Sequence, residues 1–247
     1  MASTSETGHA NNVANFENLI TSTTAFGTSY NPSKETLKSP SLITLLGAAK
    51  ESLNAVNIAQ SAYSNAVAAR ESSFEPFSKL ITRVNNALKA TDTTTQVDES
   101  AQTIVRKLQG KRASAKLTDE EKKALEAEGK EVTQISATQL SYDSRLENLD
   151  KLIMLLSSVA LYNPNEEELK VTSPTTYYNE LKAKNSDVLV PTIQLSNARI
   201  SRNDILYKSQ TGLVDRAFDT KVYIKSVFGA TSPQYKQISK LSFTLRN

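Results

Sequence analysis

Two arginines interrupt an otherwise apolar helical pattern. Arg70 and Arg202 lie 132 residues apart, at equal positions of the internal repeat described below. A guanidinium inside a helical bundle needs a carboxylate, because an unpaired buried charge costs several kcal/mol. The acids that recur in the same way are Glu17 and Glu147, so we predict structural ion pairs among these four residues. Two alternatives stay open: the arginines extend to the bundle edge, or together they bind an anion.

A cluster of basic residues is the second group that could bind an anion. Five basic side chains fall within eleven residues with no acid among them: Arg106, Lys107, Lys111, Arg112 and Lys116. Such a cluster can contact phosphates. No aromatic residue is interleaved for base stacking, and the acidic residues 119–121 follow at once. The pattern therefore favours a solvated linker, and nucleic acid is not an expected partner.

Catalytic and metal chemistry find little support in the composition. The chain has no cysteine, which excludes thiol nucleophiles, disulfides, zinc–thiolate sites and iron–sulfur clusters. The single histidine, His9, lies in a polar segment, residues 1–12, that we expect to be a disordered tail. Chemistry based on carboxylates alone stays open. We nevertheless expect no catalytic residue, metal or cofactor, and we interpret the chain as non-enzymatic.

The elements that must position these residues are long helices. From Leu42 to Leu88 the chain has apolar residues at twelve of fourteen positions with alternating three- and four-residue spacing, which is typical of a helix. The pattern predicts one helix over 41–90, with a kink at Pro76. Ser41 is the expected N-cap of this helix.

The second half of the chain repeats this arrangement. Ser173 is the expected N-cap of a second long helix, which Pro191 should kink. A capping box at Thr118 predicts that the linker over 111–142 is also helical. Shorter helices are expected near 13–26, 97–109 and 233–241.

The repeat itself covers 41 aligned positions. Shifting the chain by 132 residues places Tyr30 on Tyr162, and 14 of the positions up to Arg70 and Arg202 are then identical. We interpret this match as a tandem duplication with helical units over 13–110 and 143–243.

Long apolar seams need packing partners, because helix propensity alone stabilises an isolated helix too little. We therefore predict an all-α fold: an elongated bundle of long antiparallel helices built from the tandem duplication. A long coiled coil exposed to solvent is the alternative geometry.

Three tracts, residues 110–116, 131–137 and 230–241, resemble those of uncharacterised helical proteins from Bacteroidota. The resemblance runs from about Asn31 to Leu241, and the last tract is its most distinctive part. It implies an all-helical bacterial protein and implies no activity, ligand or catalytic residue.

Charge and hydropathy set the remaining expectations. The 29 basic and 26 acidic residues nearly balance, and no signal peptide is evident, so we expect a cytoplasmic protein. The most apolar segment, Leu152–Leu161, is too short to span a bilayer and suits a buried helix. The favoured function is a structural or protein-interaction role with a protein partner or self-association. The alternative is an α-helical pore-forming or membrane-active protein that uses this segment.

Overall fold

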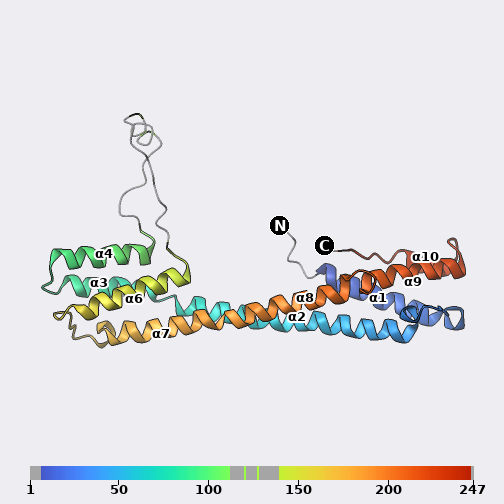
Figure 1. Ribbon diagram of the computed structural model, residues 1–247, viewed down its shortest axis with the longest axis horizontal. Coiled ribbons are helices and arrows are strands. Elements are labelled where there is room, and N and C mark those ends of the chain that lie inside the picture. The colour runs from blue at the N-terminus through green and yellow to red at the C-terminus, as the bar shows by residue number, and fades with distance from the viewer. Residues whose placement is uncertain (1–6, 112–119, 121–126, 128–138, 246–247) are drawn as a thin grey trace. The chain divides into compact units, whose positions relative to one another are not determined.

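The computed structural model describes residues 7–111, 120, 127 and 139–245. Within these residues all regular secondary structure is helical and no strand forms (Figure 1), which confirms the all-α prediction.

The chain forms two compact units. Unit 1 comprises residues 1–64 and 190–247, and unit 2 comprises residues 65–189. These units differ from the repeats found in the sequence. Each combines the beginning of one predicted repeat with the end of the other, so the predicted units 13–110 and 143–243 are not the compact bodies.

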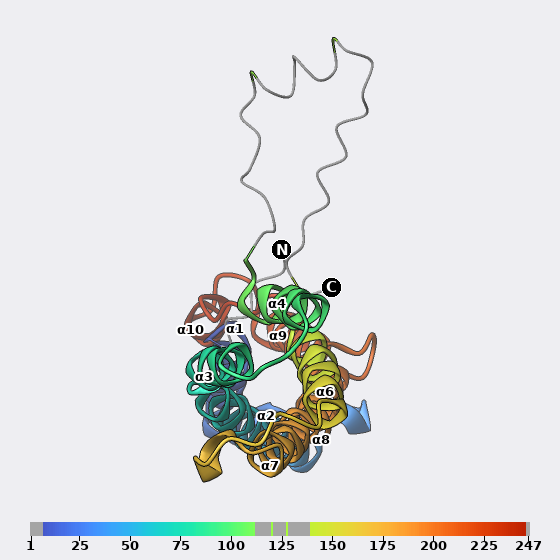
Figure 2. The ribbon, with the colours of Figure 1, turned by 90° about the vertical axis from the view of Figure 1, so that its left-hand side faces the viewer.

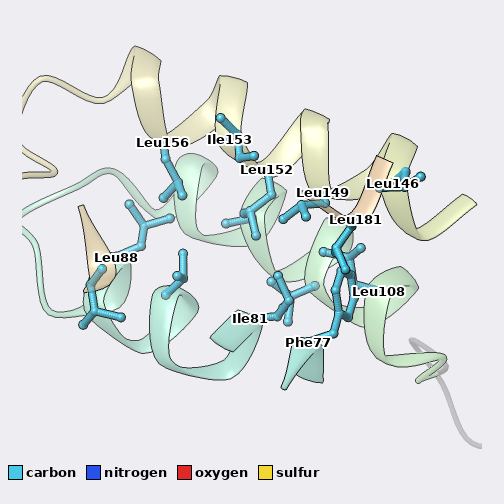
Figure 3. Close-up of a cluster of buried hydrophobic side chains, with 14 of the residues drawn as sticks. Phe77, Ile81, Leu88, Leu108, Leu146, Leu149, Leu152, Ile153, Leu156 and Leu181 are labelled. Atoms are coloured by element: carbon cyan, nitrogen blue, oxygen red, sulfur yellow. The ribbon is translucent and has the colours of Figure 1, made fainter. Parts of the chain in front are cut away.

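Unit 2 is a helical bundle with a continuous apolar core. Its helices are α3 (Phe77–Lys89), α4 (Thr95–Gln109), α6 (Tyr142–Ser158), the 3₁₀ helix η3 (Glu167–Leu169) and α7 (Thr172–Asp187). Helix α4 packs against both α3 and α6, and α6 packs against α7 (Figure 2). Figure 3 shows the core side chains that meet between these helices, including Ile81 from α3, Leu108 from α4, Leu152 from α6 and Leu181 from α7.

Unit 1 contains the remaining helices. They are α1 (Thr7–Ala25), the 3₁₀ helices η1 (Gly27–Ser29) and η2 (Glu35–Leu37), α2 (Ser39–Ser73, which enters unit 2 after Ser64), α8 (Leu189–Tyr207, which belongs to unit 1 from Val190 on), α9 (Leu213–Phe228) and α10 (Pro233–Ser239). Helix α9 packs against α1, η2 and α10. Its buried residues join Phe16 and Leu19 of α1 in a second apolar core.

The start of α1 corrects one prediction. Residues 7–12 belong to a helix, so the expectation of a disordered tail over 1–12 is wrong for this part. His9 and Asn12 are buried, and His9 Nδ1 lies 2.7 Å from Tyr207 Oη. Asn12 donates to the Thr244 carbonyl at 2.9 Å and accepts from the Thr244 N–H at 3.0 Å. These polar groups stay buried because distant segments supply their hydrogen bonds.

The long helix predicted over 41–90 is two helices. α2 ends at Ser73 and α3 begins at Phe77, with Pro76 as the residue that precedes α3. Pro76 has no N–H to continue the hydrogen-bond ladder of α2, so a new helix starts directly after it.

The second predicted long helix is also divided, between α7 and α8 at Val188. Pro191 stands in the first turn of α8, where the missing N–H costs little. Neither expected N-cap is correct: Ser41 lies inside α2, which begins at Ser39, and Ser173 lies inside α7, which begins at Thr172.

The shorter helices agree better with the sequence. α1, α4 and α10 fall where helices were predicted near 13–26, 97–109 and 233–241. The helix predicted in the linker over 111–142, with its capping box at Thr118, lies largely outside the described residues.

Two glycines give opposite expectations for replacement by alanine. A Cβ at Gly212, before α9, would lie 2.7 Å from Lys208 N and 2.8 Å from Lys208 O, both backbone atoms. We expect Gly212→Ala to lower the free energy of unfolding by about 1–3 kcal/mol, because the backbone must shift. Gly47, within α2, has no neighbouring atom within 4 Å of such a Cβ.

Gly47→Ala is therefore expected to raise the free energy of unfolding by about 0.5–1 kcal/mol, since alanine loses less backbone entropy in a helix. Urea denaturation of both variants tests this contrast. A stabilising Gly212→Ala substitution would show that the turn before α9 is looser than described.

Candidate interaction surface

The predicted ion pairs between the recurring arginines and acids do not form. Glu17 binds Lys50 Nζ at 2.6 Å, and Glu147 binds Lys151 Nζ at 2.6 Å. All four of these side chains are about half exposed or more. The hydrogen bond and the charge of Lys151 lower the pKa of the Glu147 carboxyl below its usual range. These are surface pairs, which contribute little to stability.

Arg70 is held by an aromatic ring and an amide instead. Its guanidinium carbon lies 4.0 Å from the centroid of the Tyr142 ring. Arg70 Nη1 donates to Asn185 Oδ1 at 3.3 Å, and Asn185 Nδ2 donates to Asp143 Oδ1 at 2.7 Å. Asp143 is therefore connected to Arg70 only through the side-chain amide of Asn185.

Arg202 has a different environment, in unit 1. The residue is buried, and its Nε and Nη2 donate to Asn203 Oδ1 at 3.1 and 2.8 Å. Neither arginine pairs with Glu17 or Glu147, so the prediction of structural ion pairs among these four residues is wrong.

The basic cluster begins at the end of α4. Arg106 and Lys107 lie in the last turn of that helix, and the left-handed Gly110 is its C-cap. Basic residues in a last turn stabilise the carbonyl end of the helix dipole, which gives both a structural reason. Lys111 follows directly, whereas Arg112 and Lys116 lie outside the described residues.

The apolar segment Leu152–Leu161 supplies core residues from one side of α6. Leu152, Ile153 and Leu156 are buried in the unit 2 core, whereas Met154 is 63% exposed. The expected core burial is therefore found for one face of this helix. No helix among the described residues is long and apolar enough to cross a membrane.

Helix α8 carries two opposite apolar faces, which the sequence analysis did not separate. The inner face includes the buried residues Leu195, Arg202 and Leu206. On the opposite side of the helix, Ile193 and Ile200 are 60% and 58% exposed, and Leu189 and Val190 are exposed to a similar extent. These four side chains follow the three- and four-residue spacing of one helix face, and we call them the outer face of α8.

The outer face of α8 is free of charged side chains. From Leu189 to Asn203 the only charged residues are Arg199 and Arg202. Both belong to the inner side: Arg202 is buried, and Arg199 Nη2 donates to Gln60 Oε1 of α2 at 3.0 Å. Depletion of charge around exposed aliphatic residues is typical of the core of a protein–protein interface.

A groove lies along one side of this face. It has a volume of about 610 Å³ and is lined by Gln60 and Tyr63 of α2 and by α8 residues, including Ser196 and Ile200. Its lining contains no acid and no histidine, so it offers no carboxylate or imidazole general base and no set of metal ligands. Among the described residues no group of three or more histidines, cysteines or acids could hold a metal ion.

Comparisons with known proteins give no information on the function of the chain. No protein-family model, no curated protein and no solved structure matches the chain.

Proposed function

We propose that the protein is a non-catalytic structural and interaction protein that self-associates through the outer face of α8. The observation that carries the proposal is the row of exposed aliphatic side chains at Leu189, Val190, Ile193 and Ile200, without a charged residue among them. Exposed apolar residues grouped on one helix face mark interaction sites more often than scattered ones do.

A second copy of the chain is the partner that this surface fits best. An uncharged face meets the same face of another copy without like-charge repulsion, and a symmetric dimer needs only one self-complementary patch. A nucleic acid or an anionic membrane would gain no electrostatic attraction here. Because four aliphatic side chains per chain bury a modest area, we expect a reversible dimer with a dissociation constant in the micromolar range or weaker.

We also propose that the chain arose by tandem duplication, and matching structural details support this. Tyr30 Oη donates to the Leu37 carbonyl at 2.6 Å, and Tyr162 Oη donates to the Leu169 carbonyl at 2.7 Å, 132 residues later. In both places a 3₁₀ helix and then a long helix follow.

We propose further that helices adjacent in the chain run antiparallel within each unit. The short connection between α3 and α4, and the packing of α6 on α7, support this arrangement. Since each unit joins the beginning of one repeat with the end of the other, the two proposed copies would have exchanged their later helices.

The self-association proposal is tested by Ile193→Glu. We expect the parent chain to show a concentration-dependent rise from 27.0 kDa toward twice that mass in sedimentation equilibrium. Ile193→Glu should weaken the association by about tenfold or more, because it places a carboxylate inside an apolar contact.

Ile58→Glu is the matched control. Ile58 is 63% exposed on α2, with an exposed fraction close to that of Ile193, and it does not belong to the outer face of α8. This control should associate like the parent. A parent chain that stays monomeric at several hundred micromolar, or an equal loss in both variants, would refute the proposed interface.

A further inference from the structure

A small cavity in unit 2 combines an apolar lining with one arginine. Its volume is about 270 Å³, and it lies where the start of α3, the end of α4 and the start of α6 meet. Phe77 and Leu108, which are drawn in Figure 3, line it together with Phe74, Leu140 and Arg145. Phe74, Phe77 and Leu108 are buried, so the apolar wall is fixed by the packing of the core.

Arg145 is the unusual member of this lining. Within the described residues its side chain makes no ion pair and no hydrogen bond, and its Nε is shielded from solvent without an acceptor. Among the described residues its guanidinium faces only the Phe77 ring, with 5.9 Å from the guanidinium carbon to the ring centroid. A partly desolvated cation without a counter-charge is unfavourable, and an anion beside it would relieve that cost.

Other arginines of the two units have such partners. Arg83 binds Glu168 at 2.6 Å, and Arg216 lies 3.6 Å from Asp219. Arg70, whose Nε is also shielded, stacks on Tyr142 at 4.0 Å and donates to Asn185. Arg83 and Arg216 also line cavities, but each has its acid there, whereas the lining around Arg145 contains no acid.

We propose that this cavity binds a small carboxylate that carries an apolar group, independently of the self-association proposed above. A carboxylate matches the planar guanidinium, which forms its strongest hydrogen bonds with such groups. The apolar part of the ligand would contact Phe77, Leu108 and Leu140. The volume is below the roughly 300–1,000 Å³ of pockets for drug-sized molecules, so the site selects a ligand of about one ring or a short chain.

Two polar residues at the cavity can assist in holding the carboxylate. Ser78, in the first turn of α3, and Gln109, the last residue of α4, both line it. The Gln109 amide already donates to Thr82 Oγ1 at 2.9 Å. The Ser78 hydroxyl is therefore the better second donor, and Arg145 is the only cationic residue of the lining.

Titration calorimetry of the full chain with three probes of similar size tests the proposal. Phenylacetate carries the charge, phenylacetamide is its neutral analogue, and benzylammonium reverses the charge. We expect saturable binding of phenylacetate below about 1 mM, with the amide at least about tenfold weaker and the cation not bound. Higher salt should weaken phenylacetate binding, because the attraction depends on charge.

Arg145→Met keeps an unbranched side chain, removes the guanidinium and its charge, and should reduce phenylacetate affinity by about tenfold or more. Arg83→Met is the matched control, since it removes an arginine of the same unit that is paired with Glu168, and it should bind like the parent. Circular dichroism and thermal unfolding of both variants confirm that they are folded.

Two results would overturn the proposal. One is the absence of phenylacetate binding to the parent chain. The other is equal affinity of the parent and Arg145→Met, which would show that the arginine does not hold the ligand. Neither result bears on the dimer, because Ile193 lies in the other unit.

Discussion

Leu152→Ala is expected to lower the free energy of unfolding by about 3–4 kcal/mol, whereas Met154→Ala, two residues away, should change it by less than about 0.5 kcal/mol. Leu152 is 1% exposed in the core of unit 2, and Met154 is 63% exposed. The first substitution removes buried methyl groups and leaves a cavity, while the second removes a side chain that is largely in water already.

This contrast also separates the two functions that the apolar segment Leu152–Leu161 allows. Urea denaturation of both variants, with the same probe and buffer, gives the two changes directly. Similar small losses at both positions would mean that this part of α6 is not packed as described, and would return the membrane-active interpretation to consideration. A large decrease in the free energy of unfolding for Leu152→Ala alone would show that this side of α6 is packed in the core.

The helices were predictable where packing and backbone chemistry act locally. The three- and four-residue spacing from Leu42 to Leu88 reflects burial, and Leu42, Ile81 and Leu88 are indeed fully buried. Proline marked both interruptions, because a missing N–H is a property of the residue itself. The pattern could not show that α2 and α3 are separate helices, since apolar residues continue through the break, at Phe74 within it and at Phe77 directly after it.

Long-range polar contacts were not predictable from the pattern. The segment around His9 and Asn12 is hydrophilic, and its composition alone predicts disorder. It folds because its hydrogen-bond partners are Tyr207 and Thr244, about 200 residues away in the chain. A polar residue is buried at low cost once its hydrogen bonds are made, but its composition does not reveal the partner.

The recurring arginines and acids failed as ion pairs for a related reason. Recurrence at a fixed shift shows that a position is shared by both repeats, and it does not identify a contact. Glu147 has Lys151 one helical turn away, and this local pair forms. Arg70 was expected inside a helical bundle with a carboxylate partner, and an aromatic ring proved to be its main neighbour.

The sequence analysis did not find the candidate interaction surface, because the apolar residues of α8 were not divided between the two faces of the helix. Leu195 and Leu206 belong to the inner face, and Leu189 and Ile193 to the outer one, yet all four contribute to the same apolar content. The useful sequence feature was the lack of charge: a solvent-exposed helix face normally carries lysines and glutamates.

The stability of both units should fall steeply above pH 10 through two buried tyrosines. Burial raises the pKa of Tyr30 and of Tyr162 to about 12, from an ordinary value of 10.0. Between these values the unfolded chain loses the phenolic proton and the folded chain keeps it. The free energy of unfolding is therefore unaffected below pH 10, and decreases by up to about 2.7 kcal/mol per tyrosine as the pH rises to 12.

The hydrogen bonds of these tyrosines also predict that the free energy of unfolding decreases as the pH rises above 10. Each phenol donates to a backbone carbonyl, of Leu37 or of Leu169, and a phenolate has no proton to donate. Replacement of either tyrosine by phenylalanine should cost about 1 kcal/mol at pH 8, because one hydrogen bond is lost. The same replacement should make the protein less sensitive to pH between 10 and 12, so the stability curves of parent and variant converge.

Urea denaturation at several pH values from 8 to 12 measures both effects, with Tyr63→Phe as the control. Tyr63 is only partly buried, and its replacement leaves both buried phenols in place. Lysines also titrate in this range, but they remain in every variant and cancel in the comparison. A Tyr30→Phe and Tyr162→Phe double variant that loses stability with pH as steeply as the parent would show that these phenols are not protected from ionisation by burial.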